Sequence, residues 1–591
     1  MIVTPDILKE RAFQTVVKEY LTTVHGYIEG TNQDYNRQYA VDETQLFLFL
    51  EETQKKSLEK LKEIYKGQYK QKILFRLDNE LKRRGMVDVL RKGIKDYGVH
   101  LNLAYFKPPT TLNQELMELY TKNRLSVTEE LVHKEGERID LVIFLNGLPV
   151  LAFELKNEFT GQNVEDAKYQ WMYERSGKDL LFRFKQRVIA CFAIDTDEVY
   201  MTTKLDGTKT FFLPFNKGYN NGKGNPPVKG KIKTHYIWED MLSRDSLLEI
   251  LDKFVYLKVD EEEDDEGNIK TKETLIFPRY HQRDAIRKIL SHAKMFGPGQ
   301  SYLIQHSAGS GKTNTISWLS HRLATLHNDQ NQSVFDGVIV VTDRKVLDKQ
   351  LQKAVYQLEH KAGMVAKIEE DSAQLADALN KGIKIIITTI QKFPYILDKI
   401  GTLKNKNYAI IIDEAHSSTS GKNMAALTTS LTLEEAQKLD EEAEANEMDA
   451  EDKILDEINR VGKQPNISFF AFTATPKGST LKMFGTEDAQ GKPQPFHLYS
   501  MKQAIEEGFI LDVLKNYVTY KTYYKIAKKI EEDPVFESAK ATKAISRFVS
   551  LHPHNIEQKT EIMVEHFRKI TSKKLNGKAK AMVVTASRLH A

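Results

Sequence analysis

Three charged residues interrupt an otherwise apolar stretch between residues 138 and 157 of the sequence. Asp140, Glu154 and Lys156 lie in two apolar runs on either side of an Asn-Gly pair, an arrangement typical of a β-hairpin. Two facing carboxylates can hold a divalent cation, which activates water and stabilises charge that develops on a phosphodiester. The lysine shares a face with Glu154 because side chains alternate along a strand, so it can orient the nucleophile. The pattern predicts metal-dependent hydrolysis of a phosphodiester, and a surface hairpin with ion-paired charges is the alternative.

The length of the hairpin turn decides whether the two carboxylates meet. A two-residue loop would place Asp140 opposite Phe153, with Glu154 on the other face. A three-residue loop pairs Leu145 with Pro149 and places Asp140 directly opposite Glu154, with Cβ atoms about 5 Å apart. Glycine often takes the left-handed position of a three-residue loop. We therefore expect that loop and the facing carboxylates.

A glycine-rich segment further along the chain has the composition of a phosphate-binding loop. It follows the apolar run "SYLIQ" and contains Gly309, Ser310, Gly311, Lys312 and Thr313. A strand, a glycine-rich turn and a helix present backbone N–H groups and a helix N-terminus to phosphate oxygens. The lysine would reach the β- and γ-phosphates, and the threonine hydroxyl would bind Mg²⁺. His306 stands where the G-x-x-x-x-G-K-[ST] pattern has its first glycine, and a lysine after a flexible turn is the alternative interpretation.

A pair of acidic residues ends the apolar run in "YAIIIDEAH", downstream of the glycine-rich segment. Asp413 and Glu414 follow a predicted buried strand, and ligands of open α/β sheets collect at such strand ends. Asp413 can hold Mg²⁺ through water, and Glu414 can polarise the attacking water. Together with the phosphate loop, the pair predicts a site for ATP and Mg²⁺, rather than a solvated strand end.

The composition is that of an ordinary globular protein. The chain has 591 residues, of which 41% are hydrophobic and 28% charged, and its net charge is only +4, so any basic surface must be local. The single cysteine, Cys191, excludes an intrachain disulfide and suits a reducing compartment. The N-terminus lacks the pattern of a signal peptide, and no apolar run approaches 18 residues. We therefore expect a cytoplasmic, multidomain protein without a membrane span.

The texture of the sequence changes along the chain. Residues 42–96 are predicted to be mainly helical, and β-type runs alternate with a helical stretch from about 127 to 200. A loop rich in Gly, Asn, Pro and Lys covers 215–231, and the acidic run that follows at 259–267 is expected not to pack and to separate two domains. Beyond it, near-continuous apolar runs separated by helical stretches predict a parallel α/β sheet, with a charged helical insertion over 432–460.

Three motifs in this second half resemble a known family. "HSAGSGKT", "IIDEAH" and "AFTATP" occur in the order of motifs I, II and III of superfamily 2 helicases and translocases. "RYHQRDAI" resembles the element that contacts adenine in that family, with Gln282 as the contact. "VVTDRKVLDKQL" and "TTIQKF" resemble its strand-tracking motifs, whose polar side chains suit phosphate contacts. The resemblance implies a RecA-like parallel α/β motor domain.

The end of the chain resembles the beginning of a second RecA-like domain. "AKAMVVTASRLHA" is similar to the first strand region of that domain, and the sequence then stops at Ala591. The arginine finger that the family carries in its second domain is not in the sequence. We therefore expect a truncated form with weak or absent DNA-stimulated ATP turnover.

The hairpin at 138–157 resembles the PD-(D/E)xK nuclease signature. Asp140 is followed, after a strand, a turn and a second strand, by Glu154-x-Lys156, although Ile139 replaces the proline of the pattern. Gln170, with a tyrosine three residues later, resembles the glutamine-tyrosine element of some of these nucleases. The resemblance implies catalytic roles for the carboxylates, the lysine and the glutamine, with a metal held by the carboxylates.

A nuclease followed by a superfamily 2 motor resembles the restriction (R) subunit of type I restriction enzymes. The resemblance implies an endonuclease domain over 1–258, an acidic linker over 259–272, a first RecA-like domain over 273–498 and an incomplete second one over 499–591. It also implies ATP-dependent translocation on DNA coupled to Mg²⁺-dependent cleavage of double-stranded DNA. Methyltransferase and specificity subunits are the implied partners. A repair-type helicase-nuclease, a translocase that does not cut and a nucleotide-binding scaffold without turnover are the alternatives.

Overall fold

The computed structural model describes most of the chain. The described residues are 12–263, 269–342, 345–358, 406–413, 464–512, 553–573 and 579–585, with short stretches between 363 and 389, at 396–397 and between 455 and 462. The chain divides into two compact units, one of Met1–His416 with Ile454–Ile510 and one of Ser417–Lys453 with Leu511–Ala591. The first unit holds two seven-stranded sheets. In the second, the described helix α20 runs over Pro553–Lys569.

The N-terminal half is built on a seven-stranded mixed sheet. β6, β7 and β8 are antiparallel neighbours at its centre, and β9 pairs with β8 in parallel. In spatial order the strands are β1 (Ile28–Glu29), β6 (Leu125–Lys134), β7 (Glu137–Leu145), β8 (Leu148–Leu155), β9 (Ala190–Ile194), β10 (Val199–Thr202) and β11 (Leu213–Pro214). All eight residues of β8 are buried, as expected for a central strand with neighbours on both sides.

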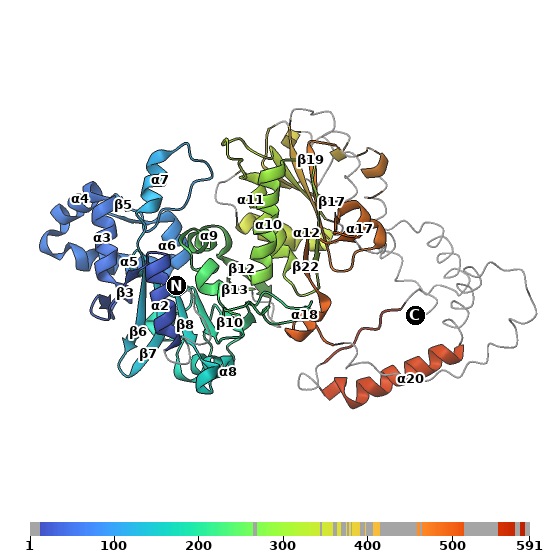
Figure 1. The fold of residues 1–591 in the computed structure, drawn as a ribbon, viewed down its shortest axis with the longest axis horizontal. Helices are drawn as coiled ribbons and strands as arrows, with labels where there is room; N and C mark the ends of the chain where they lie inside the picture. The colour runs from blue at the N-terminus through green and yellow to red at the C-terminus, as the bar shows by residue number, and fades with distance from the viewer. Residues whose placement is uncertain are drawn as a thin grey trace, which may run out of the picture. The chain divides into compact units, whose positions relative to one another are not determined.

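Helices supply the rest of the N-terminal half. The predicted helical region is confirmed and contains α3 (Glu43–Thr53), α4 (Lys55–Tyr65), α5 (Tyr69–Arg84) and α6 (Met86–Lys92). α2 (Phe13–Val24) lies across β6 and β7 (Figure 1). On the opposite face lie α8 (Val164–Tyr169) and the π-helical turn η3 (Gln170–Glu174), so the helix expected around residue 164 is present and ends in a wider turn.

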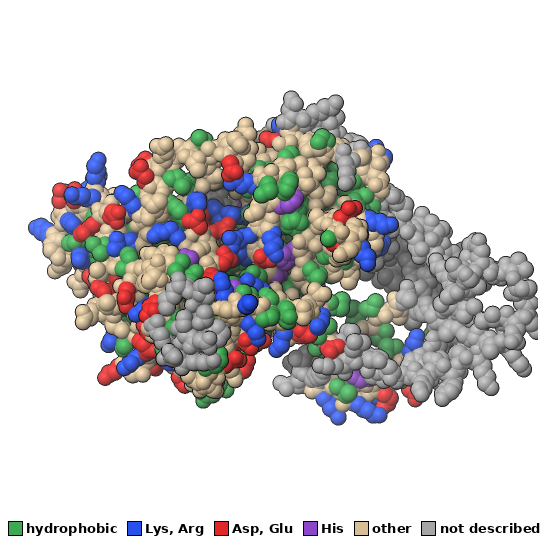
Figure 2. Space-filling view, in the orientation of Figure 1, with side chains coloured by type: hydrophobic (Ala, Val, Ile, Leu, Met, Phe, Trp, Pro, Cys, Tyr) green, Lys and Arg blue, Asp and Glu red, His purple; other side chains and the backbone are tan. Residues whose placement is uncertain are grey.

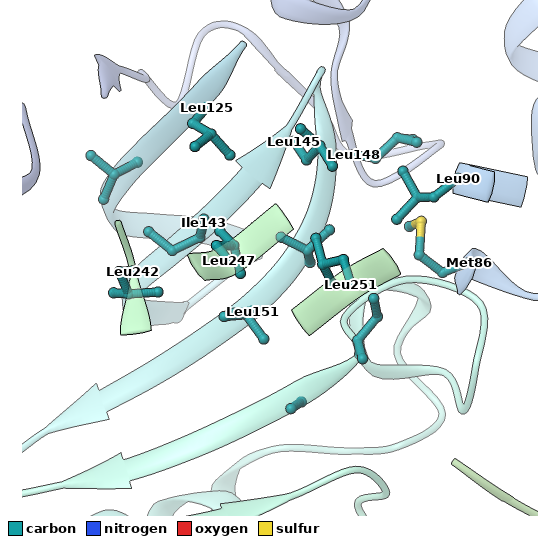
Figure 3. Packing of buried hydrophobic residues seen from close by; sticks show 14 of the residues in the cluster. Met86, Leu90, Leu125, Ile143, Leu145, Leu148, Leu151, Leu242, Leu247 and Leu251 are labelled. Atoms are coloured by element: carbon teal, nitrogen blue, oxygen red, sulfur yellow. The ribbon is translucent and has the colours of Figure 1, made fainter. Parts of the chain in front are cut away.

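The two faces of the central hairpin belong to different cores. Side chains of Ile143, Leu145 and Leu151 pack with Leu247 of α9 (Arg244–Glu249) and Leu251 of η6 (Ile250–Phe254), as Figure 3 shows. The alternate side chains of β7 and β8 pack with α8 and η3 in a smaller core. A charged side chain on the face that packs with α8 and η3 is therefore at least partly buried by η3 and the residues that follow it.

The second sheet has seven strands that are all parallel, as the sequence predicts. In spatial order they are β16 (Val365–Lys367), β17 (Ile385–Thr389), β15 (Gly337–Thr342), β18 (Tyr408–Ile412), β19 (Ile467–Thr473), β14 (Ser301–His306) and β22 (His497–Tyr499). α10 (Tyr280–Phe296), α11 (Lys312–Ala324) and α12 (Lys345–Gln357) connect and cover the strands (Figure 1). β22 pairs with β14 and crosses the predicted boundary after residue 498.

The acidic run was expected not to pack; its first residues do take part in a strand, whereas residues 264–267 lie outside the described residues. β12 (Tyr256–Glu263) and β13 (Ile269–Ile276) form an antiparallel ladder from the Tyr256–Ile276 pair to the Glu263–Ile269 pair. Tyr256 belongs to the core of the parallel sheet, whereas Leu275 belongs to the core of the N-terminal sheet. The hairpin therefore joins the two cores, and its acidic residues lie toward the outer end of the ladder.

Charges of both signs are distributed over the surface. On the face drawn in Figure 2, Lys and Arg side chains are interspersed with Asp and Glu, in agreement with the small net charge of +4. Among the residues that the structure describes, no helix combines the length and the apolar character needed to cross a membrane. The loop predicted over 215–231 is free of helices and regular strands.

Candidate functional sites

The turn of the central hairpin differs from the prediction. Leu145 pairs with Leu148 across a two-residue turn, and Asn146 (φ 51°) and Gly147 (φ 80°) both have left-handed backbone. This is the combination that a tight hairpin turn requires. A Cβ atom on Gly147 would lie 2.3 Å from the carbonyl oxygen of Asp42, so the position excludes any side chain. The expected three-residue loop is therefore wrong.

A β-bulge restores the predicted alignment of the carboxylates. Phe144 pairs with Pro149, but the next pairs along the hairpin, from Ile143 with Leu151 to Leu141 with Phe153, are shifted by one residue. Val150 is the extra residue in β8. The shifted register, continued by one pair, sets Asp140 opposite Glu154, as expected. The sequence thus predicts the facing carboxylates correctly, although the turn and the bulge that produce them were not foreseen.

The two carboxylates have different surroundings. Asp140 is half-buried, and its Oδ2 atom accepts a hydrogen bond of 2.7 Å from the backbone N–H of Leu155. Glu154 is fully buried, and its Oε1 atom accepts two hydrogen bonds from Arg175, from Nε at 3.0 Å and from Nη2 at 2.9 Å. The other oxygen, Oε2, is buried and has no hydrogen-bond partner among the described residues. Burial, together with the negative charge of Asp140, raises the pKa of Glu154 to about 8.

Arg175 contacts the candidate site and was not predicted from the sequence. It directly follows η3, its side chain is 7% exposed, and its Nη2 atom also donates to the carbonyl oxygen of Arg138 at 2.7 Å. The guanidinium therefore ties the end of η3 to both strands of the hairpin. Residue spacing in the sequence does not predict this contact. The π-helical turn η3 sets the position of the arginine relative to the preceding helix, and such a turn has no spacing pattern.

The other predicted residues of this site lie nearby. Lys156 is buried just beyond the end of β8, where its backbone N–H donates to Ile194 at 2.8 Å. Gln170 is the first residue of η3, and its Oε1 atom is buried without a hydrogen-bond partner among the described residues. Tyr173 is exposed and stacks on Tyr169 with ring centroids 4.5 Å apart. The structure brings Asp140, Glu154 and Lys156 to one face, but no hydrogen bond between described residues links Gln170 to the carboxylates.

The residues of the hairpin fit a divalent cation. Glu154 presents a buried oxygen without a partner, and a second carboxylate shares its face. Burial raises the pKa of Glu154 most, and the negative charge of Asp140 on the same face raises it further. Oxygen ligands of this kind are those that Mg²⁺ and Mn²⁺ prefer. Asp140 and Glu154 would hold the ion, and Arg175 stabilises the charge on Glu154 from the other side.

The phosphate loop connects β14 to α11. Gly309 (φ 72°) and Gly311 (φ 80°) have left-handed backbone, which favours glycine. A Cβ atom on Gly311 would lie 2.6 Å from Nε2 of Gln282. Ser310 between them is buried, and the Lys312 ammonium donates across the loop to the carbonyl oxygen of His306 at 3.3 Å. The loop has the turn and the helix start that the prediction requires.

The residue that replaces the first glycine of the pattern causes no strain. His306 is the last residue of β14, where extended backbone accepts any side chain. It is fully buried, and its Nε2 atom lies 2.9 Å from Nδ1 of His497 in the neighbouring strand β22. His497 in turn lies 3.1 Å from a carboxylate oxygen of Asp284 in α10. The His306 side chain, which replaces the glycine of the pattern, therefore links β14 to β22 and, through His497, to α10.

Gln282 contacts the phosphate loop itself. Its side-chain amide donates to the carbonyl oxygen of Gly311 at 3.0 Å and accepts from the backbone N–H of Arg279 at 2.9 Å. The Arg279 guanidinium donates to the carbonyl oxygen of Gly309 at 3.2 Å and to Glu507 at 2.8 Å. The start of α10 thus braces the loop. A contact between Gln282 and adenine stays a prediction.

The acidic motif lies at the same edge of the sheet as the phosphate loop. Thr313 is the second residue of α11, which follows β14, and Asp413 directly follows β18. β19 lies between these strands, and its last residue, Thr473, is buried. Because all three strands are parallel, their carboxyl ends share one edge. Glu414 lies outside the described residues, and so does Arg344 of the predicted strand-tracking segment "VVTDRKVLDKQL".

Two sequence-family models match two separate regions of the chain. Residues 281–545 match the sequence model of the family described as SWI2/SNF2 ATPase, and residues 7–210 match that of the type I restriction enzyme R protein N terminus. The parallel sheet with the phosphate loop lies within the first match, and β1 to β10 of the mixed sheet, with the carboxylate pair, lie within the second. The resemblance to the R subunits of type I restriction enzymes is confirmed.

Individual relatives carry the same names. A protein of Methanocaldococcus jannaschii, whose name places it with type I restriction endonuclease subunits, is 23% identical over 570 residues, covering 89% of this chain and 49% of its own length. The type I restriction enzyme SauCOLORF180P endonuclease subunit of Staphylococcus aureus is 23% identical over 432 residues, covering 71% of this chain and 39% of that protein. The chain thus spans about half the length of these relatives, or less.

One solved structure has a similar description. A nuclease-deletion mutant of the Type ISP restriction-modification enzyme LlaGI, in complex with a DNA substrate mimic, is 16% identical. The match covers 49% of this chain and 24% of that chain, with a TM-score of 0.22. A TM-score of this size carries no further conclusion about the fold.

Proposed function

We propose that the chain carries the nuclease and the motor of a type I restriction enzyme. It would hydrolyse ATP to move double-stranded DNA and would cut that DNA with Mg²⁺ at the Asp140–Glu154 pair. The observation that carries the nuclease part is the buried Oε2 atom of Glu154, which has no partner among the described residues and lies on the same face as Asp140. The matched R-protein N terminus and the names of the relatives support the same assignment.

Each predicted residue of the nuclease site has a role in this cleavage. A bound Mg²⁺ would supply Lewis acidity to the scissile phosphodiester and to water. Asp140 and Glu154 would bind it through carboxylate oxygens, and the hydrogen bond from Leu155 orients the Asp140 carboxylate. Lys156, buried two residues beyond Glu154, would orient the nucleophile or stabilise charge on the phosphate. Gln170, the first residue of η3 and five residues before Arg175, would have the catalytic role that the resemblance implies for it.

The motor residues have the roles usual for phosphoryl transfer. Backbone N–H groups of the loop over 309–311 would hold the phosphates, and the Lys312 ammonium would exchange its bond to His306 for one to the nucleotide. Thr313 and Asp413 would bind Mg²⁺, Glu414 would polarise water, and Gln282 would contact adenine. DNA, methyltransferase and specificity subunits are the proposed partners of the whole enzyme. Contacts to phosphates, and not to bases, would carry the DNA.

A titration with Mn²⁺, without nucleotide, tests the nuclease site directly. In calorimetry, Asp140→Ala is expected to bind Mn²⁺ at least tenfold more weakly at the hairpin site, so that a binding event seen with the parent chain is lost, whereas any event at another site of the chain is unchanged. Asp329→Ala removes an exposed acidic side chain and is the matched control. Equal binding in all three proteins would contradict the proposal and favour a translocase that does not cut.

Plasmid cleavage gives the second test. It is measured on the reconstituted complex, which is the whole enzyme assembled with the proposed methyltransferase and specificity subunits. Asp140→Ala is expected to abolish cleavage while ATP turnover stays within about twofold, because the motor residues are untouched. Cleavage that survives in the variant would contradict the role of the hairpin. Cleavage that requires a free DNA end would instead indicate a repair-type helicase-nuclease.

A further inference from the structure

A second cluster of candidate metal ligands lies near the turn that joins β6 to β7. Nε2 of His133, Oε2 of Glu137 and Oδ2 of Asp179 lie within 4.8 Å of one another. Each of these atoms is shielded from solvent, and none has a hydrogen-bond partner among the described residues. The His133 side chain is only 2% exposed, and its nitrogen lies 3.3 Å from the Glu137 oxygen. Three polar atoms gathered in this way without hydrogen bonds leave an unmet requirement for a ligand.

The local structure aims these side chains at one point. The register between β6 and β7 shifts between Val132 and Lys134, so His133 is the bulged residue, and bulges commonly redirect a side chain. The imidazole packs edge-on against Phe182, with ring centroids 5.1 Å apart. Phe182 and Asp179 belong to the same turn, since the Phe182 N–H donates to the Asp179 carbonyl oxygen at 3.0 Å. The segment after η3 therefore brings the third ligand to the hairpin.

We propose that His133, Glu137 and Asp179 form a binding site for a divalent transition metal ion, with Zn²⁺ as the reference ion. One imidazole nitrogen and two carboxylate oxygens are a ligand set that Zn²⁺ and Mn²⁺ accept. Ligand atoms on a tetrahedral Zn²⁺ lie about 3.4 Å apart, close to the 3.3 Å between His133 and Glu137. A small closure of the Asp179 side chain would complete the protein's three ligands.

This site is separate from the carboxylate pair of the proposed nuclease. Glu137 precedes Asp140 by three residues of β7, which corresponds to about 10 Å along a strand. Two metal ions that share one phosphodiester lie about 4 Å apart. The second ion would therefore not take part in the chemistry. It would fix Asp179, and with it the segment that begins at Arg175, against the end of the hairpin.

A lysine beside the cluster provides the competing explanation. The Lys134 ammonium lies 2.7 Å from Oε1 of Glu137 and 3.7 Å from Oδ2 of Asp179, and its side chain is 51% exposed. It balances part of the negative charge from the solvent side. It contacts the oxygen of Glu137 that is not aimed at His133, but it also faces Oδ2 of Asp179, so a metal ion would have to displace the ammonium from that oxygen. With Lys134 as the sole counter-ion, the buried His133 nitrogen would have only the Glu137 oxygen, 3.3 Å away, as a partner.

Calorimetric titration of the full chain with Zn²⁺ tests the site, in an Asp140→Ala background that removes the nuclease pair. The expected result is one Zn²⁺ per chain and a rise in Tm of several degrees on binding. His133→Gln and Asp179→Asn are each expected to weaken binding by at least tenfold. His100→Gln changes an exposed histidine and is the matched control. No binding, or equal binding in all variants, would overturn the proposal.

Lys134→Met separates the metal site from the counter-ion explanation. If the cluster binds a metal, removal of the competing ammonium leaves the Zn²⁺ affinity unchanged or higher. If Lys134 is the sole counter-ion, Tm falls and no Zn²⁺ binds, which contradicts the proposal. Circular dichroism checks the folding of every variant, and Asp179→Asn, at a 22% exposed side chain, replaces His133→Gln if the buried substitution does not fold.

Discussion

The two candidate sites are assembled in different ways. The phosphate loop is a continuous segment, and its two left-handed glycines and the helix that follows are encoded within a few residues. The carboxylate pair faces correctly only because a bulge at Val150 shifts the register, and Arg175 reaches Glu154 only from a separate turn. The first site depends on local conformation, the second on packing between elements. The difference predicts which substitutions leave one site intact while they disable the other.

Lys312→Ala is expected to have the largest effect. Loss of the ammonium that would hold the β- and γ-phosphates should lower ATP turnover of the reconstituted complex by at least 100-fold. Cleavage that depends on translocation should fall with it, whereas Mn²⁺ titration of the chain should not change. Lys294→Ala, on the exposed end of α10, is the matched control. Loss of Mn²⁺ binding in Lys312→Ala would show that the two sites are not independent.

Glu154→Gln tests the electrostatics of the hairpin through stability. In metal-free protein the pKa of Glu154 is raised from 4.5 to about 8, so the folded state holds a proton that the unfolded state releases. The free energy of unfolding therefore falls as the pH rises from about 4.5 to about 8 and is level above that window. Glutamine removes this loss and should make the variant more stable at pH 8.5 by about 3 kcal/mol.

The measurement is urea denaturation in EDTA at pH 5 and pH 8.5. The difference in unfolding free energy between the variant and the parent should grow with pH. Glu165→Gln changes an exposed carboxylate of α8 and should show no such growth. A difference that stays constant between the two pH values would mean that Glu154 is ionised throughout.

Arg175→Met is expected to weaken the nuclease while the motor is unaffected. Removal of the guanidinium takes away the positive charge that opposes the rise in the Glu154 pKa, so a proton competes better with the metal. Cleavage should fall by about tenfold near neutral pH, and its pH profile should move to higher pH. Arg175→Lys should restore only part of the activity, because lysine lacks the planar group that donates to Oε1 of Glu154 through two nitrogens and to the carbonyl oxygen of Arg138 at the same time. An unshifted profile would leave Arg175 with a structural role alone.

How much the sequence could predict follows from the same comparison. The phosphate loop and the parallel sheet were predicted because glycine spacing and apolar runs act locally. The facing carboxylates were predicted from hairpin geometry, although the loop was wrong, since nothing in the sequence indicates the bulge at Val150. Arg175 and the cluster around His133 depend on a π-helical turn and a second bulge, which have no sequence signature. The acidic strand β12 was misjudged because charge indicates exposure but does not exclude a ladder.

Gln282→Ala is expected to have the smallest effect, and it examines how local the phosphate loop is. The glutamine amide bonds the carbonyl oxygen of Gly311 and fills the space where a side chain at that position would lie. Its loss should weaken ATP binding by about three- to tenfold, both through the loop and through the proposed adenine contact.

GTP, which lacks the adenine amino group, separates these two contributions of Gln282. An equal loss for ATP and GTP would assign Gln282 to bracing the loop, whereas a loss confined to ATP would assign it to the base. Gln300→Ala, near the start of β14, is the matched control. If the loop forms independently of α10, neither nucleotide should bind more weakly to the variant.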